Sequence, residues 1–376
     1  MSIYLDYNAS APILPEVLDI MMDVYRNTPG NADSRTHIFG TNAGKLVQQS
    51  RKSIAAVMGV DPSELFFTAG ATESNNTCIL GIQDHAEKTG KKHIITTAIE
   101  HSAVLEPIKQ LEKRGFEVDY IKPDVSGRVK TEDVLKHIRP ETVLVSIMFV
   151  NSETGIIQPV DEIGKVLKER GILFHVDATQ ALGKLNPEIR SLNYNMMSVT
   201  AHKIGGPQGI GALILKWDEN YQRPPITPLM YGGHQERGFR PGTTPVALVA
   251  GFAKAAELSE ERRVDVMMKC AKVKENLLKA LEGIQYTING DPHYCLPSTI
   301  NLSINGLDAE AAFLTLGDYY SFSNGSACNS STHTLSYVLE AMGLSEKRRA
   351  EAIRLSWNGT ENIDFSNFIE IVKAMV

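Results

Sequence analysis

The sequence predicts an α/β protein with a mostly parallel central sheet, and two observations lead to this prediction. Short β-rich runs alternate with segments of helical period, as in "HIITTA" followed by "SAVLEPIKQLEKRG" and "TVLVSIMFV" followed by "VDEIGKVLKERG". After about Pro245 the pattern changes to a long helical stretch, then "STINLSING" and another helical segment. We therefore expect a large domain over residues 14–250 and a smaller α/β domain made of residues 1–13 and 251–376.

Composition and charge narrow the classes of function. The chain has 376 residues, of which 43% are hydrophobic and 22% charged, as is usual for a folded globular protein. Its formal net charge is −6 with acids and bases interspersed, so no basic stripe indicates direct nucleic-acid binding. No stretch reaches the roughly 20 apolar residues of a membrane span, and "MSIYLDYNASAP" lacks the pattern of a signal peptide. We expect a cytoplasmic enzyme.

The cysteines are few and widely spaced. Cys78, Cys270, Cys295 and Cys328 show no paired spacing, which argues against a zinc site or a disulfide framework, and we expect no metal site. The first three lie in or near apolar runs, as small buried residues do. Cys328 lies instead in "SFSNGSACNSSTHTLSYVLEAMG", whose small polar residues predict a mobile exposed loop.

The first strand end with functional potential follows "ELFFT". Here Gly70 permits a tight turn, and Ala71 and Thr72 open the next predicted helix. The free N–H groups and positive dipole of a helix start suit a phosphate group. The alternative is that Thr72 is simply a helix cap.

Polar residues also follow three further strands, where ligands bind in sheets of this class. His101 stands after "HIITTAIE", Asn151 after "SIMFV", and Asp177 after "ILFHV", with Gln180 one helical step further. Because a buried lone carboxylate is costly, we expect a cationic group to face Asp177. The alternative for Asp177 is that it only caps the following helix.

The segment "TAHKIGGPQGIGAL" places Lys203 beside His202 and before four glycines. Such a lysine could be a solvated side chain in a polar turn or an amine that reacts with a bound ligand. A pyridoxal phosphate site needs a lysine for the Schiff base, an acid beside the pyridine nitrogen and a nest for the phosphate. Lys203, Asp177 and the turn at Ala71 and Thr72 supply all three, so we predict pyridoxal 5'-phosphate as the cofactor.

The order of motifs along the chain resembles that of the cysteine desulfurases, pyridoxal phosphate enzymes of the class V aminotransferase group with the type I fold. The matching segments are "YLDYNASAP", "FTAGATESNN", "EHSAVL", "VNSETGIIQPV", "HVDATQALGK", "TAHKIGGPQGIGAL", "RPGT" and "NGSACNSS". The resemblance covers essentially the whole chain. It implies a homodimer with shared sites, in which a residue of one subunit reaches the phosphate bound by the other.

The resemblance also implies roles for individual residues. Lys203 would carry the cofactor, Asp177 would pair with its ring nitrogen, and His101 would stack on the ring and shuttle protons. The remaining cofactor contacts would come from Gln180, Asn151, Ala71, Thr72, Thr200, His202 and, across the dimer, Thr243. Arg354 would bind the substrate carboxylate, with Asn31 and Asn151 nearby; without the resemblance, Arg354 could equally be a surface residue.

Cys328 is the residue that would separate a desulfurase from other enzymes of this fold. By the resemblance, its thiolate takes sulfur from bound L-cysteine, which leaves L-alanine and an enzyme persulfide. The acceptor would be a protein of iron–sulfur cluster assembly, of tRNA thiolation or of DNA sulfur modification. Alternatives are a selenocysteine lyase, another β-lyase, an aminotransferase, or a non-catalytic scaffold that retains the fold.

Several positions depart from the family pattern. Thr200 stands where serine is usual and keeps the hydroxyl, whereas Pro241 removes a backbone donor and a hydroxyl beside Thr243. Further departures are Asn329, Leu335 and the pair Trp357 and Asn358. These changes are consistent with a specialised acceptor.

Overall fold

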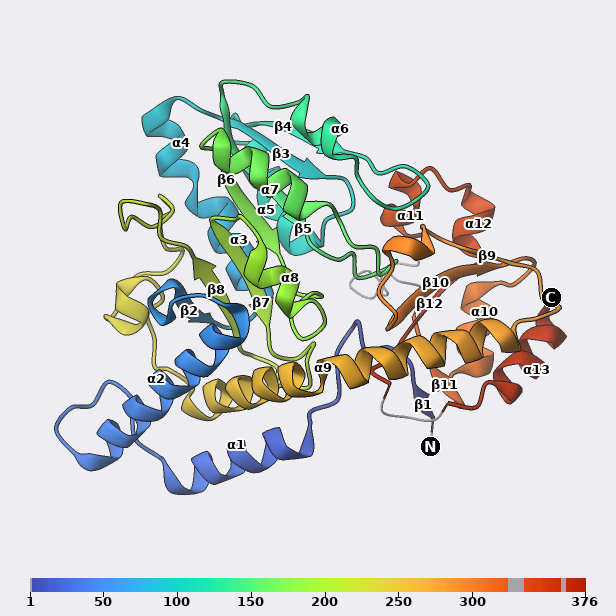
Figure 1. Cartoon of the computed structure of the whole chain (residues 1–376), viewed down its shortest axis with the longest axis horizontal. Coiled ribbons are helices and arrows are strands. Elements are labelled where there is room, and N and C mark those ends of the chain that lie inside the picture. The colour runs from blue at the N-terminus through green and yellow to red at the C-terminus, as the bar shows by residue number, and fades with distance from the viewer. Residues whose placement is uncertain (1, 324–334, 360–362) are drawn as a thin grey trace.

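The computed structural model describes residues 2–323, 335–359 and 363–376, and its main feature is a sheet of seven strands (Figure 1). The strand order is β2-β8-β7-β6-β5-β3-β4. β8 is antiparallel to both of its neighbours, β2 and β7, while the other neighbouring pairs are parallel. The predicted α/β class with a mostly parallel sheet is therefore confirmed. The strands are β2 (Leu65–Thr68), β3 (His93–Thr97), β4 (Glu117–Ile121), β5 (Thr142–Met148), β6 (Leu173–Asp177), β7 (Met196–Thr200) and β8 (Gly211–Leu215).

Both faces of this sheet are covered, so its central strands are almost entirely buried. Successive residues of one strand enter different cores: Phe66 packs in a core with helices α3 and α5, whereas Phe67 packs in a core with α2, α7 and α9. Strands that are apolar on both faces produce the continuous apolar runs seen in the sequence. The helices around this sheet are α1 (Pro15–Asn27), α2 (Ile38–Met58), α3 (Ala71–Gly81), α4 (Gln83–Thr89), α5 (Ser102–Glu112), α6 (Thr131–Leu135), α7 (Val160–Glu169) and α8 (Asn186–Ser191).

A smaller sheet forms the second part of the molecule. Its order is β12-β10-β9, with antiparallel pairing throughout. The elements of this part are β9 (Tyr286–Ile288), β10 (Thr299–Ile304), β11 (Tyr320–Ser321), β12 (Ala352–Ser356), α10 (Ala309–Leu316), α11 (Tyr337–Ala341), α12 (Glu346–Ala350) and α13 (Ser366–Met375). Short 3₁₀ turns lie at Pro62–Glu64, Gln235–Gly238 and Pro292–Tyr294.

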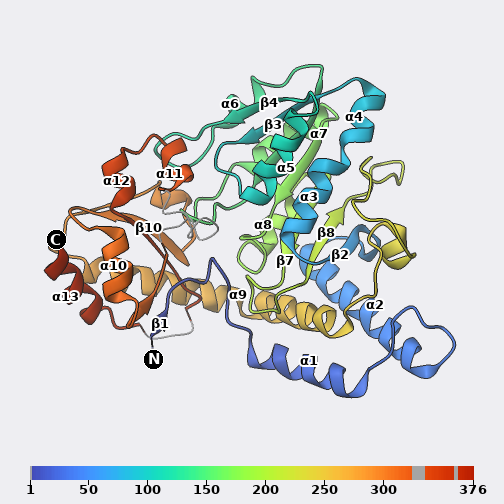
Figure 2. The same ribbon diagram turned by 180° about the vertical axis from the view of Figure 1, so that it is seen from behind.

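Two segments join the two parts. Helix α9 (Val246–Ala280) contributes its first half to the core of the large sheet and its second half to the core of the small one, and it runs along both in Figures 1 and 2. The N-terminal strand β1 (Ile3–Tyr4) pairs with β11, and Leu5 is buried in the small core. The chain then crosses to the large sheet. The domain limits expected from the sequence, 14–250 against 1–13 and 251–376, stay a prediction.

Over the described residues, no helix combines the length and the apolar composition that a membrane crossing requires.

Candidate active site

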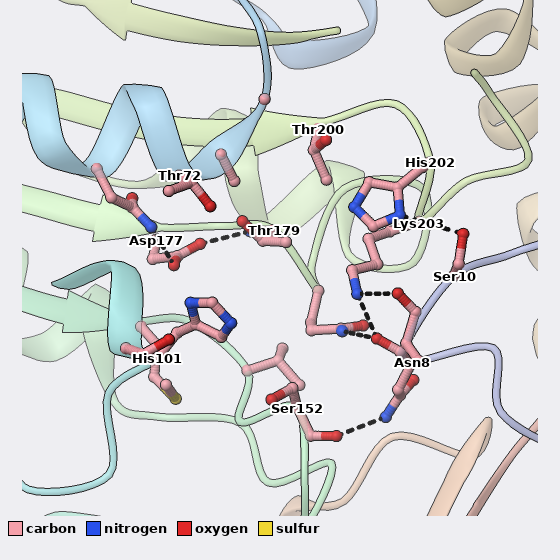
Figure 3. A pocket seen from close by; sticks show the side chains of 18 of the residues that line it. Asn8, Ser10, Thr72, His101, Ser152, Asp177, Thr179, Thr200, His202 and Lys203 are labelled. Carbon is pink, nitrogen blue, oxygen red and sulfur yellow. Dashed lines mark hydrogen bonds between the residues drawn. The ribbon is translucent and has the colours of Figure 1, made fainter. Parts of the chain in front are cut away.

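A cavity of about 880 Å³ lies where the strands of the large sheet end and the small part begins (Figure 3). Because β2, β3, β5, β6 and β7 run in one direction, their carboxyl ends gather at the same edge of the sheet. The structure brings together nine residues that the sequence nominated, from five different segments. They are Ala71, Thr72, His101, Asp177, Gln180, Thr200, His202, Lys203 and Arg354.

Three nominated residues of the described part of the chain do not line the cavity. Asn151 is buried just behind the cavity, where its Oδ1 accepts hydrogen bonds from the backbone N–H groups of Glu153 and Thr154 and so shapes the loop after β5. Asn31 and Thr243 are exposed and are not among the residues that line the cavity. Cys328 and Asn329 lie outside the described residues.

Lys203 follows β7 in a turn that requires glycine. Gly205 has φ 77°, in the left-handed region that side chains rarely adopt, and an added Cβ there would also lie 2.6 Å from Leu14. The Lys203 ammonium points into the cavity and donates to the carbonyl oxygens of Asn8 (2.5 Å) and Ala9 (2.7 Å). Both acceptors are neutral backbone carbonyl oxygens of one segment.

Asp177 ends β6 and is 5% exposed. Its Oδ2 accepts from the Asn75 amide (2.7 Å) and its Oδ1 from the Thr179 backbone N–H (3.0 Å). These two donors stabilise the carboxylate. His175, also on β6, is neutral at physiological pH, because burial lowers its pKa to about 4. The cation expected to face Asp177 stays a prediction.

Two polar atoms beside Asp177 are buried and have no hydrogen-bond partner in the described part of the chain. They are Asn75 Oδ1 and Thr179 Oγ1, and both residues line the cavity. An unsatisfied buried polar atom costs about 1–3 kcal/mol, so such atoms are kept where a ligand or water completes them. This end of the cavity is therefore suited to a polar ring whose protonated nitrogen faces Asp177.

The opposite end of the cavity suits an anion. Gly70, with φ 151°, turns the chain into the 11-residue helix α3, whose first N–H groups at Ala71 and Thr72 face this end. The Thr200 hydroxyl also lines the cavity; its single proton is directed to the Ile210 carbonyl oxygen at 3.3 Å, and it would have to rotate to donate to an anion. His202 is neutral at physiological pH, because burial and the nearby Lys203 charge lower its pKa to about 4.

His101 is held by the helix that follows it. Its Nδ1 accepts from the Ala103 backbone N–H (3.1 Å) and so caps α5. An atom that accepts an N–H carries no proton, so the single proton of the neutral ring lies on Nε2. Figure 3 shows the ring extending into the cavity beside Asp177. His101 can therefore present an N–H donor to a bound group.

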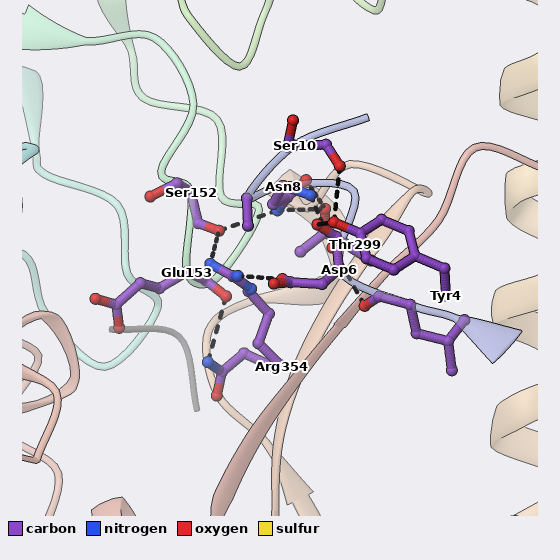
Figure 4. A network of polar contacts seen from close by, with 12 residues as sticks. Tyr4, Asp6, Asn8, Ser10, Ser152, Glu153, Thr299 and Arg354 are labelled. Carbon is purple, nitrogen blue, oxygen red and sulfur yellow. Dashed lines mark hydrogen bonds and ion pairs between the residues drawn. The ribbon is translucent and has the colours of Figure 1, made fainter. Parts of the chain in front are cut away.

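Arg354 enters from β12 of the small sheet and is only 2% exposed (Figure 4). Its Nη2 pairs with Asp6 Oδ1 (2.5 Å), and its Nη1 donates to the Ser152 carbonyl oxygen (3.2 Å). Its backbone pairs with Ser323, the last described residue before the segment that contains Cys328. A guanidinium held in this way is suited to bind a small carboxylate.

Residues 6–10, here named the N-terminal strap, form a wall of the cavity to which the sequence reasoning assigned no role. Asn8 donates from its side chain to the Ser152 carbonyl oxygen and the Thr299 hydroxyl, both at 3.0 Å, while its own carbonyl oxygen accepts from Lys203. Other cavity residues without a predicted role are Asn75, Ser152, Glu153, Thr179 and Tyr337. The only available signal was their place inside the motifs "YLDYNASAP", "TESNN", "NSETG", "DATQ" and "SYVLE".

Comparisons with known proteins agree with this geometry. The family model described as Aminotransferase class-V matches residues 3–357. The chain is 42% identical over 354 residues to "Cysteine desulfurase, mitochondrial" of Arthroderma benhamiae, which covers 94% of this chain and 70% of that protein. It is 39% identical over 382 residues to "Cysteine desulfurase IscS" of Escherichia coli, which covers 100% of this chain and 93% of that protein. A solved structure described as a NifS-like protein superposes with a TM-score of 0.92 at 34% identity over the whole of both chains.

Proposed function

Because this chain belongs to the class V aminotransferases and, within them, to the cysteine desulfurases, we propose that the cavity removes sulfur from L-cysteine with Cys328 as the receiving thiol. The net reaction converts L-cysteine and the Cys328 thiol into L-alanine and a Cys328 persulfide. The observation that carries this assignment to the cavity is the convergence of Lys203, Asp177, His101 and Arg354 on one space.

The residues of the cavity fit pyridoxal 5'-phosphate, the cofactor implied by the family. Lys203 would tether it, Asp177 would hold its ring nitrogen protonated, and the start of α3 with Thr200 and His202 would hold its phosphate. The unpartnered Asn75 Oδ1 and Thr179 Oγ1 support this fit, because both lie beside Asp177 and require a polar group. When bound, the cofactor supplies an electron sink for the amino acid joined to it.

The side chains around this group would orient the substrate and move protons. Arg354 would hold the substrate carboxylate, and the Nε2 proton of His101 would be available to the reacting amino acid. The Cys328 thiolate would attack the substrate Sγ: the new S–S bond forms as the Cβ–S bond breaks, and the electron pair stays on the carbon skeleton. That carbon then takes up a proton, which gives alanine.

We also propose a homodimer that delivers sulfur to an acceptor protein. Thr243 supports the dimer, since it is exposed and lies outside the cavity of its own subunit, where a residue that serves a neighbouring site belongs. The exposed apolar residues Leu229, Met230 and Tyr231 precede it on the same loop region. Acceptors of iron–sulfur assembly, tRNA thiolation or DNA sulfur modification are all compatible with a persulfide product.

The assignment is tested by incubating the purified protein with pyridoxal 5'-phosphate and cysteine. Alanine is quantified, and mass spectrometry is used to find one added sulfur on the peptide that contains Cys328. Cys328→Ser should keep the visible absorbance of the bound cofactor but form no persulfide and release no sulfide. Lys203→Ala should lose the absorbance itself.

Cys295→Ser is the matched control, because Cys295 is a half-buried cysteine that contacts Lys274 outside the cavity. It should retain turnover. Sulfide release by the Cys328→Ser protein at the parent rate would contradict the assignment and favour a β-lyase.

A further inference from the structure

To bind a cofactor, the side-chain amide of Gln180 must have a defined orientation of Oε1 and Nε2. The shape of the amide does not determine which of the two atoms faces the cofactor. Oxygen and nitrogen of a glutamine amide have nearly the same shape, so the orientation is set by the partners. By the family resemblance, Gln180 would bind the phenolate oxygen of the cofactor ring. This anionic oxygen accepts hydrogen bonds, so the Nε2 donor of Gln180 must face it. If Gln180 Oε1 faced it instead, two acceptor oxygens would be placed against each other.

The structure supplies a partner that decides the orientation. Lys184, four residues after Gln180, donates from Nζ to Gln180 Oε1 at 2.9 Å. An ammonium has donors only, so it can bind the oxygen and not the nitrogen. On the other side, Gln180 Nε2 donates to the Asn8 carbonyl oxygen at 2.9 Å, and that oxygen can only accept. Both contacts select the same orientation.

Lys184 acts from outside the cavity. It is not among the lining residues, whereas Gln180 is a lining residue and is 4% exposed. The same Asn8 carbonyl oxygen also accepts from Lys203. Lys184, Gln180, Asn8 and Lys203 therefore form one continuous line of hydrogen bonds that ends at the reactive amine.

We propose that Lys184 is a positioning residue, which holds the Gln180 amide with its N–H group toward the cofactor and so sets the electrostatics at Lys203. This inference rests on the proposed function, because it assumes that pyridoxal phosphate occupies the cavity. It assigns Lys184 no contact with substrate or cofactor.

The surroundings of Lys184 are consistent with this role. The pKa of Lys184 is lowered to about 8. Burial is the main cause and the nearby charge of Lys203 is the second, while Cys270 of α9 acts in the opposite direction. Below about pH 8 the group is an ammonium, which can only donate to Gln180 Oε1. The neutral amine that forms above this pH can also accept, so Lys184 selects the amide orientation in its charged form.

Lys184→Met tests the inference by a spectroscopic measurement. The variant keeps the length of the side chain but cannot donate, so the Gln180 amide is free to rotate and its bond to the ring oxygen weakens. We expect the pH midpoint of the visible absorbance change of the loaded protein to rise by about one unit. Turnover should fall by about tenfold, with KM for cysteine and the cofactor Kd within about threefold.

Two further variants separate orientation from other effects. Lys184→Arg keeps a donor and should behave like the parent protein. Gln180→Ala should raise the midpoint as Lys184→Met does, and the double variant should add nothing more, because both changes act through one amide. Lys165→Met, which removes an exposed lysine paired with Asp161, is the control and should shift nothing.

The outcomes are distinct. A Lys184→Met midpoint within about 0.2 unit of the parent overturns the inference, as does a double variant whose shift is the sum of the two single shifts. If Lys184→Met does not fold, Lys184→Leu is measured in the same assays. A parent protein that shows no cofactor absorbance at all would instead overturn the proposed function.

Discussion

The two walls of the cavity are built in different ways. On the sheet side, each polar group lies within a few residues of the end of its own strand, as Asp177 and Thr200 do. On the side of the N-terminal strap, the contacts join distant parts of the chain: Asp6 pairs with Arg354, 348 residues away, and Asn8 binds Thr299, 291 residues away. The sheet wall therefore follows from local order, whereas the strap wall exists only after both ends of the chain have docked.

The two walls also differ in the part of the reaction that they would serve. The sheet wall holds the groups suited to a cofactor, and the strap wall with β12 holds the guanidinium suited to a substrate carboxylate. The Asn8 carbonyl oxygen connects the two, since it accepts from Lys203 and Gln180 of the sheet wall. Substitutions on the sheet wall should change the chemical step, and substitutions on the strap wall should change mainly KM.

The largest effect is expected for Asp177→Asn on the sheet wall. The amide keeps the size of the side chain and can still bond to Asn75 and Thr179, but it carries no negative charge to hold a ring nitrogen protonated. If the carboxylate is worth about three pKa units to that nitrogen, the loss corresponds to about a thousandfold in kcat. Steady-state kinetics check this, and a cofactor Kd close to the parent value is expected. A change in KM alone would contradict the division between the walls.

A smaller effect, of the other kind, is expected for Arg354→Lys on the strap wall. Lysine keeps the charge but cannot hold a carboxylate in a two-point contact, so KM for cysteine should rise by about a hundredfold while the cofactor absorbance stays unchanged. Arg349→Lys is the matched control, because Arg349 pairs with Glu340 on the small part away from the cavity. A fall in kcat without a rise in KM would place Arg354 in the chemical step.

The contrast between the walls also explains what the sequence could predict. The α/β class and the cavity residues Asp177, His101 and Lys203 follow from strand patterns, because a polar residue after a buried strand reaches the ligand-binding edge. Motif resemblance then supplied Arg354, which local pattern alone could not separate from a surface arginine.

The strap could not be predicted from local pattern. Nothing near Asp6 or Asn8 indicates a partner some three hundred residues later, since such contacts depend on how β12 and β10 pack against the chain start. The bond between Asn75 and Asp177 could not be predicted from local pattern either. Asn75 donates its amide N–H from α3, and the sequence reasoning considered only the start of this helix, for phosphate.

Asp6→Asn should have a moderate effect and would sharpen the role of the strap. The amide can still accept from Arg354, but the charge-assisted bond becomes a neutral one and the guanidinium is held less firmly. We expect KM for cysteine to rise by up to about tenfold with kcat changed by less than about threefold. Asp161→Asn, at an exposed ion pair with Lys165, should leave both constants unchanged. An unchanged KM for Asp6→Asn would show that Arg354 does not need the strap.

The smallest effect on catalysis and a clear effect on stability are expected for Glu100→Gln, at the base of the sheet wall. Glu100 is fully buried and accepts from the Thr97 hydroxyl (2.6 Å) and the Met148 backbone N–H (3.0 Å). Burial raises its pKa from 4.5 to about 8. A carboxyl whose pKa is raised on folding favours the folded state fully below about pH 4.5, and this contribution is lost as the pH rises through 8.

The unfolding free energy of the parent protein should therefore fall by about 3 kcal/mol from this group between pH 6 and pH 9, and Glu100→Gln should remove that part of the decline. Urea unfolding at the two pH values, at one fixed protein concentration because dimerisation would add to stability, measures the difference. Glu340→Gln, at an exposed glutamate of α11, should keep the full decline of the parent. Parallel pH profiles for the parent and Glu100→Gln would mean that Glu100 is already ionised when the protein folds. The sheet wall would then hold a buried charge in addition to Asp177, as the strap wall holds the buried Arg354.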